Sequence, residues 1–238
     1  VMRNVLSVER FFIDAAAYWV EAAVTAIELR GRFDVALAGG RTPEKLYRLV
    51  SKSPRMAGYW PRVHLWFGDE RCVPPDSKQS NFDMVSKALI DHVEGVNVHR
   101  MEGELVPEEA ADRYGNYLDQ LKQGGEIAVL DLVMLGVGVD GHIASLFPES
   151  DNYLERTKPV SAAYIEAVGM WRLSMTLPVI QAAREIMVLA SGKEKAEIVA
   201  EIMEGRQSSL PAAQIAHLPQ TAWYMDEAAS GKLSQDNI

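Results

Sequence analysis

The 238-residue chain contains a single cysteine, Cys72. A lone cysteine excludes an intramolecular disulfide and a cysteine metal cluster, and it favours a reducing, cytoplasmic setting. No apolar run approaches the roughly 18 residues of a membrane span. The N-terminal residues lack the basic start and short apolar core of a signal peptide. Basic residues number 24 against 33 acidic ones, a net charge of −9, which argues against nucleic acid as the main partner.

Histidine is also scarce, with five in the chain. Four of them are scattered and show no metal-ligand spacing, so we predict no metal site (His64, His92, His99 and His217). The fifth, His142, lies two residues after Asp140, in a glycine-rich turn behind the apolar run 132–135. A carboxylate and an imidazole at the end of a buried strand are typical of an acid–base site in an α/β protein. We therefore predict that both are catalytic; a purely structural histidine is the alternative.

Apolar residues make up 48% of the chain, which is enough for one large core. We expect a single domain over residues 1–238. Predicted strands alternate with helices, which favours an α/β fold: an open, mostly parallel twisted sheet with helices on both faces. The predicted helices are 8–30, a helix starting at 42, 80–91, 107–122 and 193–204. The predicted strands are 33–38, 63–67, 96–99, 130–135, 159–168, 171–177, 185–190 and 222–225.

A glycine pair follows the first of these predicted strands. Gly39 and Gly40 would let a ligand approach the backbone closely. Thr42 is the predicted N-cap of the next helix, with Pro43 at its first position, so free N–H groups would point at the same space. We interpret the segment as a phosphate cradle to which Arg41 adds charge. An ordinary strand-to-helix turn is the alternative, and no Gly-Lys-Ser/Thr follows to make a Walker loop.

Charged residues follow another predicted strand. Asp69, Glu70 and Arg71 lie at its carboxyl end, where open α/β sheets bind ligands. A solvated loop with a local ion pair is the alternative. The adjacent Cys72 is expected to be a small, buried hydrophobe rather than a nucleophile.

The turn that holds His142 also fits a dinucleotide fingerprint. Gly136, Gly138 and Gly141 satisfy G-x-G-x-x-G. That fingerprint requires a sustained helix directly after it, and Pro148 ends any helix within about two turns. We therefore reject dinucleotide binding.

Taken together, these motifs resemble 6-phosphogluconolactonase, within the superfamily that also contains glucosamine-6-phosphate deaminase. The resemblance runs in order from about residue 33 to 225. Its segments are Gly39–Pro43, Asp69–Pro74, Ser80–Phe82, Gly138–Pro148, Arg172–Ser174 and Gly192–Ala196. It implies a Rossmann-like fold of the deaminase type. It also implies hydrolysis of 6-phospho-D-glucono-1,5-lactone, a small-molecule substrate, without a redox cofactor and independently of NADP.

The resemblance also implies roles for individual residues. His142 would be the general base, with Asp140 orienting it or binding sugar hydroxyls, and N–H groups of the glycine turn would steady the oxyanion. The phosphate would lie against the Gly39–Thr42 loop. The implied oxyanion or turn residues are Gly138 and Gly141, and the implied substrate or phosphate ligands are Gly39, Gly40, Arg41, Thr42, Asp69, Arg71, Arg172 and Lys195.

Two alternatives follow from the same superfamily. A deaminase or isomerase would use Asp69 as a carbon-acid base, and a non-catalytic domain would only bind sugar phosphates. The deaminases typically continue Ala-Phe-Asn-Glu-Pro after the histidine, whereas this chain has Phe147 in place of the glutamate, which favours the lactonase. Many members have serine where this chain has Ala38 and Arg41, so the cradle here would rely on backbone groups. We expect a monomer or a weak homodimer.

Overall fold

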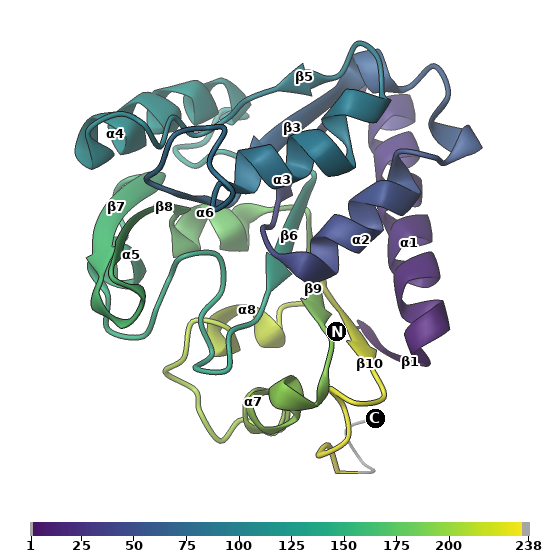
Figure 1. Ribbon diagram of the computed structural model, residues 1–238, viewed down its shortest axis with the longest axis vertical. Coiled ribbons are helices and arrows are strands. Elements are labelled where there is room, and N and C mark those ends of the chain that lie inside the picture. The colour runs from purple at the N-terminus through teal and green to yellow at the C-terminus, as the bar shows by residue number, and fades with distance from the viewer. Residues whose placement is uncertain (1, 235–238) are drawn as a thin grey trace.

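A parallel sheet forms the centre of the computed structural model, which describes residues 2–234. Within that range seven strands pair in the order β1-β10-β9-β6-β2-β3-β5, all parallel (Figure 1). Their bounds are β1 Met2–Leu6, β2 Phe33–Leu37, β3 Val63–Phe67, β5 Asn97–Val98, β6 Leu132–Gly136, β9 Glu185–Ala190 and β10 Thr221–Asp226. The predicted mostly parallel α/β sheet is confirmed.

Helices cover both faces of this sheet (Figure 1). The chain moves from β1 through β2 and β3 to β5 in one direction along the sheet, and from β6 through β9 to β10 in the other. Because such crossovers are right-handed, the helices of the two halves lie on opposite faces. One face carries α1 Val8–Arg30, α2 Arg41–Val50 and α3 Asn81–Ala88; the other carries α4 Pro107–Leu118, α6 Leu177–Ala182, α7 Ala196–Met203 and α8 Ala213–Ala216.

The reversal of direction decides where a ligand fits. Strands β2 and β6 are neighbours, yet their connections leave toward opposite edges of the sheet. At such a switch point a crevice opens beyond the carboxyl ends of the strands. The segments after β2 and β6 are the Gly39–Thr42 loop and the turn that contains His142.

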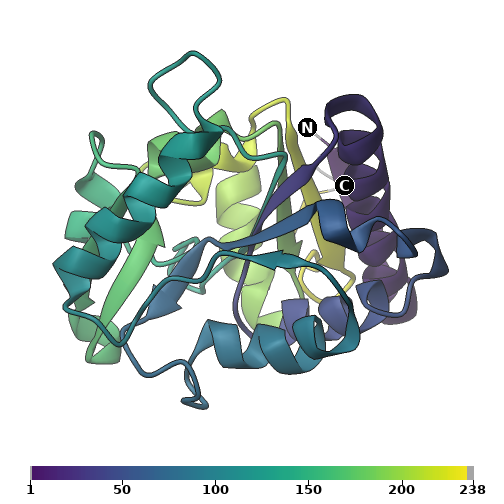
Figure 2. The same ribbon diagram turned by 90° about the horizontal axis from the view of Figure 1, so that it is seen from above.

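A second sheet of three antiparallel strands lies beside the first, in the order β4-β8-β7. It comprises β4 Asp69–Arg71, β7 Val160–Ile165 and β8 Met170–Met175, and the short helix α5 Asp151–Leu154 precedes β7. Figure 2 shows α4 over this small sheet, at the opposite side of the molecule from α1. Strand β4 was not predicted, because three charged residues carry no alternating pattern.

Most element predictions are confirmed within a few residues, and one helix start is wrong. Helix α2 begins at Arg41 with Gly40 as its N-cap, not at Thr42. Gly40 has φ 103°, a left-handed angle that favours glycine, so the N-cap lies two residues before the predicted Thr42 cap. Pro43 then occupies the third helical position, where its missing N–H has no intrahelical partner to lose.

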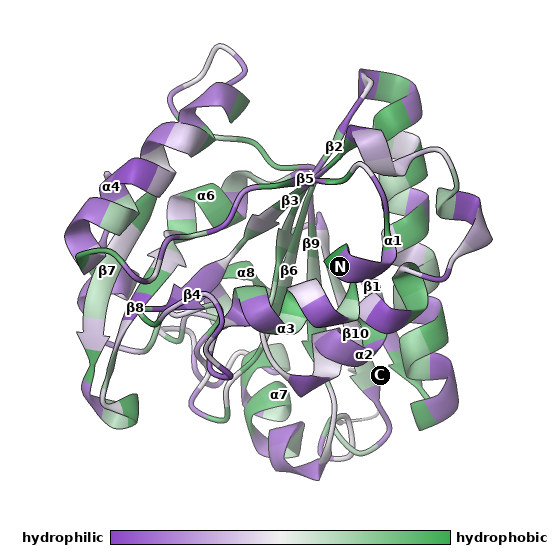
Figure 3. Ribbon diagram, turned by 45° about the horizontal axis from the view of Figure 1, so that its top comes forward, coloured by the Kyte–Doolittle hydropathy of each residue, from purple (hydrophilic) through white to green (hydrophobic). Residues whose placement is uncertain are grey.

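Apolar side chains fill the space between the layers. Strand β2 is buried throughout, as is nearly all of β6. Figure 3 shows hydrophobic residues concentrated on the central strands, while α4 is largely hydrophilic. Strands covered by helices on both faces have continuous apolar runs rather than alternation, which explains the signal at 132–135. None of the described helices combines the length and apolar character that crossing a membrane requires.

Candidate active site

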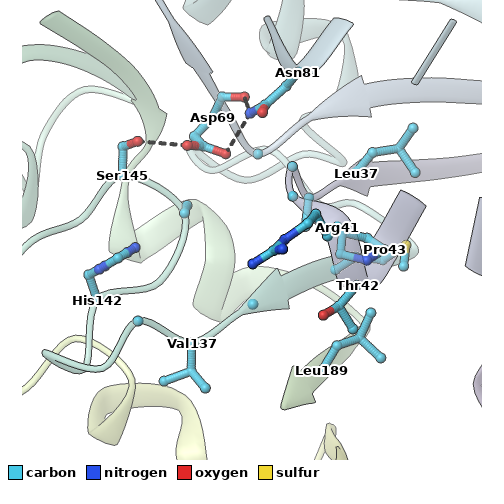
Figure 4. Close-up of a pocket in the computed structure, with 18 of the residues that line it drawn as sticks. Leu37, Arg41, Thr42, Pro43, Asp69, Asn81, Val137, His142, Ser145 and Leu189 are labelled. Carbon is cyan, nitrogen blue, oxygen red and sulfur yellow. Dashed lines mark hydrogen bonds between the residues drawn. The ribbon is translucent and has the colours of Figure 1, made fainter. Parts of the chain in front are cut away.

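A cavity of about 380 Å³ lies at the carboxyl ends of β2, β3, β6 and β9 (Figure 4). The structure brings most of the predicted site residues to its wall, from segments far apart in sequence. Those that line it are Gly39, Gly40, Arg41, Thr42, Asp69, Arg71, Gly138, His142, Arg172 and Lys195. Asp140 and Gly141 lie outside its lining.

The imidazole of His142 is held from behind by Asp140. Its Nδ1 lies 2.6 Å from Asp140 Oδ1, and the same oxygen accepts from the backbone N–H of His142 at 3.3 Å. Burial raises the pKa of Asp140, but the hydrogen bond and charge of His142 outweigh it, so the pKa is below its ordinary value. Because an ionised carboxylate only accepts, Nδ1 carries a proton, and in the neutral ring Nε2 is then the acceptor nitrogen.

One face of the imidazole is covered by Phe147. The two ring centroids lie 4.1 Å apart with an interplanar angle of 22°. This contact is built within one loop, because residues 142–148 fold back without forming a helix. The ring is thus fixed by a hydrogen bond at its edge and by a stack on its face, which is the orientation a general base needs.

The glycine turn supports this histidine but does not offer its glycine N–H groups to a ligand. The N–H of Gly138 donates to the His142 carbonyl at 2.8 Å, and that of Gly141 donates to the Gly138 carbonyl at 3.0 Å. Of the two roles expected for Gly138 and Gly141, oxyanion or turn backbone, these hydrogen bonds belong to the turn. A Cβ on Gly138 would lie 2.1 Å from His142 Nδ1, so only glycine fits there.

Cationic side chains gather on the opposite walls. Arg41, Arg71, Arg172 and Lys195 all line the cavity, and Asp69 supplies the single carboxylate of the lining. Among residues 2–234 none of the four cations forms an ion pair. Unpaired positive charge, concentrated in one cavity of an acidic chain, indicates an anionic ligand.

Two of these cations are brought side by side by the small sheet. Arg71 on β4 pairs directly with Arg172 on β8. The Nε atoms of both are buried without a hydrogen-bond partner, although Arg71 also donates through Nη1 to the Gln79 carbonyl. Burial, followed by the charge of Arg71, lowers the pKa of Arg172. A bound anion would relieve both the repulsion and the missing hydrogen bonds.

The Gly39–Thr42 loop forms the third wall. Arg41 extends into the cavity from one side and His142 lies on the other (Figure 4). A Cβ on Gly39 would lie 2.0 Å from Asn81 Oδ1, so only glycine lets the Asn81 side chain pack against this loop. The first residues of α2 line the same cavity, and the first N–H groups of a helix have no intrahelical partner, so the phosphate cradle stays a prediction here.

Asp69 is buried in the upper wall, and its surroundings were missed by the sequence analysis. Its Oδ2 accepts from Ser145 Oγ at 2.6 Å, and its Oδ1 accepts from Asn81 Nδ2 at 3.2 Å (Figure 4). Each carboxylate oxygen thus has a protein donor. Ser145 and Asn81 lie within motifs that carried the resemblance, but no local pattern indicated that both contact Asp69.

The neighbouring Glu70 has a structural role. It accepts from Ser80 Oγ and from the N–H groups of Asn81 and Phe82, which caps the start of α3. Burial raises the pKa of this carboxyl, and its hydrogen bonds only partly offset the effect. The solvated-loop alternative is therefore wrong for Glu70.

The remaining predictions concern Cys72 and the scattered histidines. Cys72 is half-buried outside the cavity lining, and burial raises its thiol pKa to about 11, which leaves it a poor nucleophile. His64 and His99, scattered in sequence, are neighbours in space, with Nδ1 and Nε2 3.0 Å apart. No cluster of three or more metal-ligating side chains occurs in the described part of the chain.

Comparison with known proteins places this site in a family. The family model described as "Glucosamine-6-phosphate isomerases/6-phosphogluconolactonase" matches residues 7–223. A 6-phosphogluconolactonase of Haemophilus influenzae is 38% identical over 201 residues, covering 82% of this chain and 85% of that protein. The structure of 6-phosphogluconolactonase from Trypanosoma cruzi superposes with a TM-score of 0.86 at 26% identity, covering 98% and 97% of the two chains.

The fold alone does not separate the activities within this family. A monomeric glucosamine-6-phosphate deaminase has a TM-score of 0.81 at 21% identity, covering 98% of this chain and 100% of its own. The matched span includes every cavity-lining segment described above. The chain belongs to the family of glucosamine-6-phosphate isomerases and 6-phosphogluconolactonases.

Proposed function

We propose that the protein hydrolyses 6-phospho-D-glucono-1,5-lactone to 6-phospho-D-gluconate, the lactone-opening step of the oxidative pentose phosphate pathway. The observation that carries this proposal is one cavity with an Asp140-oriented imidazole on one wall and four unpaired cations around it. A phosphorylated lactone requires both groups: a base for water at one end and positive charge at the other.

In the proposed mechanism His142 acts as general base. Its Nε2 takes a proton from a water molecule as the water oxygen attacks the lactone carbonyl at C1. The tetrahedral intermediate then collapses, the bond from C1 to the ring oxygen breaks, and the imidazolium returns the proton to that oxygen. Asp140 holds Nδ1–H and stabilises the imidazolium in between. No redox cofactor enters this scheme.

Substrate binding falls to the cationic walls. We propose that Arg172, Lys195 and the backbone of the Gly39–Thr42 loop hold the phosphate, and that Arg41 and Arg71 face the phosphate or the sugar ring. Each charge-assisted contact contributes about 1.5–3 kcal/mol, so two or three would select the phosphorylated lactone. Asp69 is left out of this set because both of its oxygens accept from protein donors.

The deaminase alternative is less well supported because of Phe147. The resemblance places a glutamate there in the deaminases, and here an aromatic ring stacks on His142 instead. A second carboxylate beside the imidazole is therefore missing from the described lining. Release of ammonia from glucosamine-6-phosphate would favour the deaminase, and binding without turnover would favour a sensor.

The direct test is hydrolysis of freshly generated 6-phosphogluconolactone, corrected for spontaneous opening, by wild type and His142→Ala. Loss of a general base is expected to lower kcat by about 10²–10⁴-fold. Rapid turnover by wild type and its loss in the variant are the expected results. A folded wild type without turnover would overturn the proposal.

We further propose that the protein acts as a single domain, as a monomer or a weak homodimer, in the cytoplasm. The lone, half-buried Cys72 fits a reducing compartment, and the net charge of −9 fits a small-molecule substrate better than nucleic acid. Light scattering at several protein concentrations would test the oligomeric state.

A further inference from the structure

We propose that Ser145 and Asp69 are positioning residues: their hydrogen bond holds the histidine loop, residues 140–148, against the sheet that carries Arg71 and Arg172. This inference rests on the proposed lactonase function and concerns how the two halves of that site are kept in register. No role was predicted for Ser145, and Asp69 was predicted to bind the substrate.

Ser145 is fully buried, and each of its polar groups contacts a different element. Its Oγ donates to Asp69 Oδ2 at 2.6 Å, and its N–H donates to Ser174 Oγ at 3.2 Å. Its carbonyl accepts from Asn152 Nδ2 at 3.3 Å. These partners belong to β4, β8 and α5, so the loop is attached at one point to both strands that carry the paired arginines.

The loop needs such an attachment because regular structure does not hold it. Residues 140–148 lie outside the helices and strands, apart from an isolated bridge between Ile143 and Leu146. Ala144, directly before Ser145, has φ 49°, a left-handed angle that is strained for a non-glycine residue. A strained backbone persists only where its surroundings over-determine it, and the three hydrogen bonds of Ser145 do so here.

Asp69 links this loop to the opposite wall as well. Asn81 Nδ2 donates to Asp69 Oδ1 and to the Asp69 carbonyl at 2.9 Å, and the Asn81 side chain closely approaches Gly39 of the phosphate cradle. One buried carboxylate therefore connects the histidine loop with the Gly39–Thr42 loop (Figure 4). This arrangement orients loops; it does not present a free base to a substrate.

The functional consequence follows from distance along the chain. His142 is three residues from Ser145, so release of Ser145 shifts the imidazole relative to the arginines. A displacement of about 1 Å from the reactive geometry can lower a rate by about 10²-fold. The phosphate contacts come from other segments, so affinity is expected to survive while kcat falls.

The test compares Ser145→Ala with a matched control, Thr221→Val. Thr221 is also buried and loses a comparable bond, from its Oγ1 to the Ile215 carbonyl at 2.7 Å, but it does not line the cavity. Ser145→Ala is expected to lower kcat about 10–100-fold and to leave KM within about twofold. Thr221→Val is expected to keep the wild-type kcat. Equal kcat losses in both variants would overturn the proposal, because general destabilisation would then explain them.

A double-mutant cycle with Asp69→Asn separates positioning from substrate contact. If the two residues act through one bond, the double variant is no slower than Asp69→Asn alone. Losses of kcat that multiply in the double variant would contradict the inference. So would a rise in KM in Asp69→Asn that does not depend on Ser145.

A readout without substrate keeps the test independent of the proposed function. The imidazole NMR signals of His142 are expected to move or broaden in Ser145→Ala and to match wild type in Thr221→Val. Unchanged signals in Ser145→Ala would overturn the positioning role even in an active enzyme. If wild type fails to hydrolyse the lactone, the proposed function fails, while the signals still report on the loop.

Discussion

The ring of His142 lies stacked on the ring of Phe147, with centroids 4.1 Å apart. Both residues belong to one loop. In the deaminases the resemblance places a carboxylate beside the histidine, and here an apolar ring takes its position. A histidine between Asp140 and Phe147 has one charged partner and one apolar partner. That environment suits a base that alternates between neutral and protonated forms during hydrolysis.

The stack predicts a modest and specific effect for Phe147→Leu. An aromatic pair contributes about 0.5–1.5 kcal/mol beyond its buried area, so loss of the ring is expected to lower kcat by about 2–10-fold. KM should change little, since the ring holds the imidazole and not the phosphate. Steady-state kinetics check this, and a larger effect on KM than on kcat would place Phe147 on the substrate instead.

Arg172→Ala and Lys195→Ala are each expected to raise KM. Removal of one charge-assisted contact costs about 1.5–3 kcal/mol, equivalent to about 10–100-fold in KM, with a smaller effect on kcat. Arg172→Lys is the control that keeps the charge but loses the planar fork. If KM is unchanged in both alanine variants, the phosphate lies elsewhere in the cavity.

Alanine substitutions at Gly40 and at Gly205, compared with each other, test the phosphate cradle. Both have left-handed φ angles, 103° and 70°, and open space where a Cβ would be. Alanine at either position is expected to lower the free energy of unfolding by about 1–2 kcal/mol. Only Gly40 borders the cavity, so only Gly40→Ala should also raise KM. Urea unfolding and kinetics on the same samples measure the two effects, and a KM rise in Gly205→Ala would remove the distinction.

Asp140→Asn probes the orienting carboxylate. Loss of a charge-assisted bond to His142 is expected to lower kcat by about 10–100-fold, because the imidazolium then loses its counter-charge. Lactone hydrolysis at neutral pH measures this, and a wild-type kcat in the variant would show that Asp140 does not act through His142.

The same substitution has a signature in the pH dependence of stability. The pKa of Asp140 in the folded protein is below its ordinary value of 3.8. A lowered carboxylate pKa contributes stability above the unfolded value, and that stability is lost as pH falls through the folded value. The difference in unfolding free energy between wild type and variant should thus shrink as the pH falls below 3.8. A difference that grows below pH 3.8 would contradict this sign.

Much of the fold was predictable because its signals are local. Helix α1 has its cap at Ser7, its apolar stripe and a terminal Gly31 with φ 82° within one stretch of chain. The run 132–135 indicated a buried strand without reference to any other residue. The alternation of such elements predicts a parallel sheet, and with it the edge where Gly39 and His142 meet.

The start of α2 could not be predicted from local residue types alone. Thr42 and Pro43 are good helix-start residues, but the positive φ of Gly40 places the turn earlier. A similar limit applies to the glycine turn. Glycines at 138 and 141 indicate a tight turn, and only the hydrogen bonds within that turn show that their N–H groups are occupied.

What the sequence determined by itself was therefore the order of helices and strands, the glycine turns, and the Asp140–His142 pair, because each depends on residues a few positions apart. Only the tertiary structure decided that Arg71 lies beside Arg172 and that Ser145 bonds to Asp69, 76 positions away. Those contacts arise from strand pairing and loop packing, which depend on the whole chain closing around its core. A residue that contributes to the site in this way has no local pattern that could identify it.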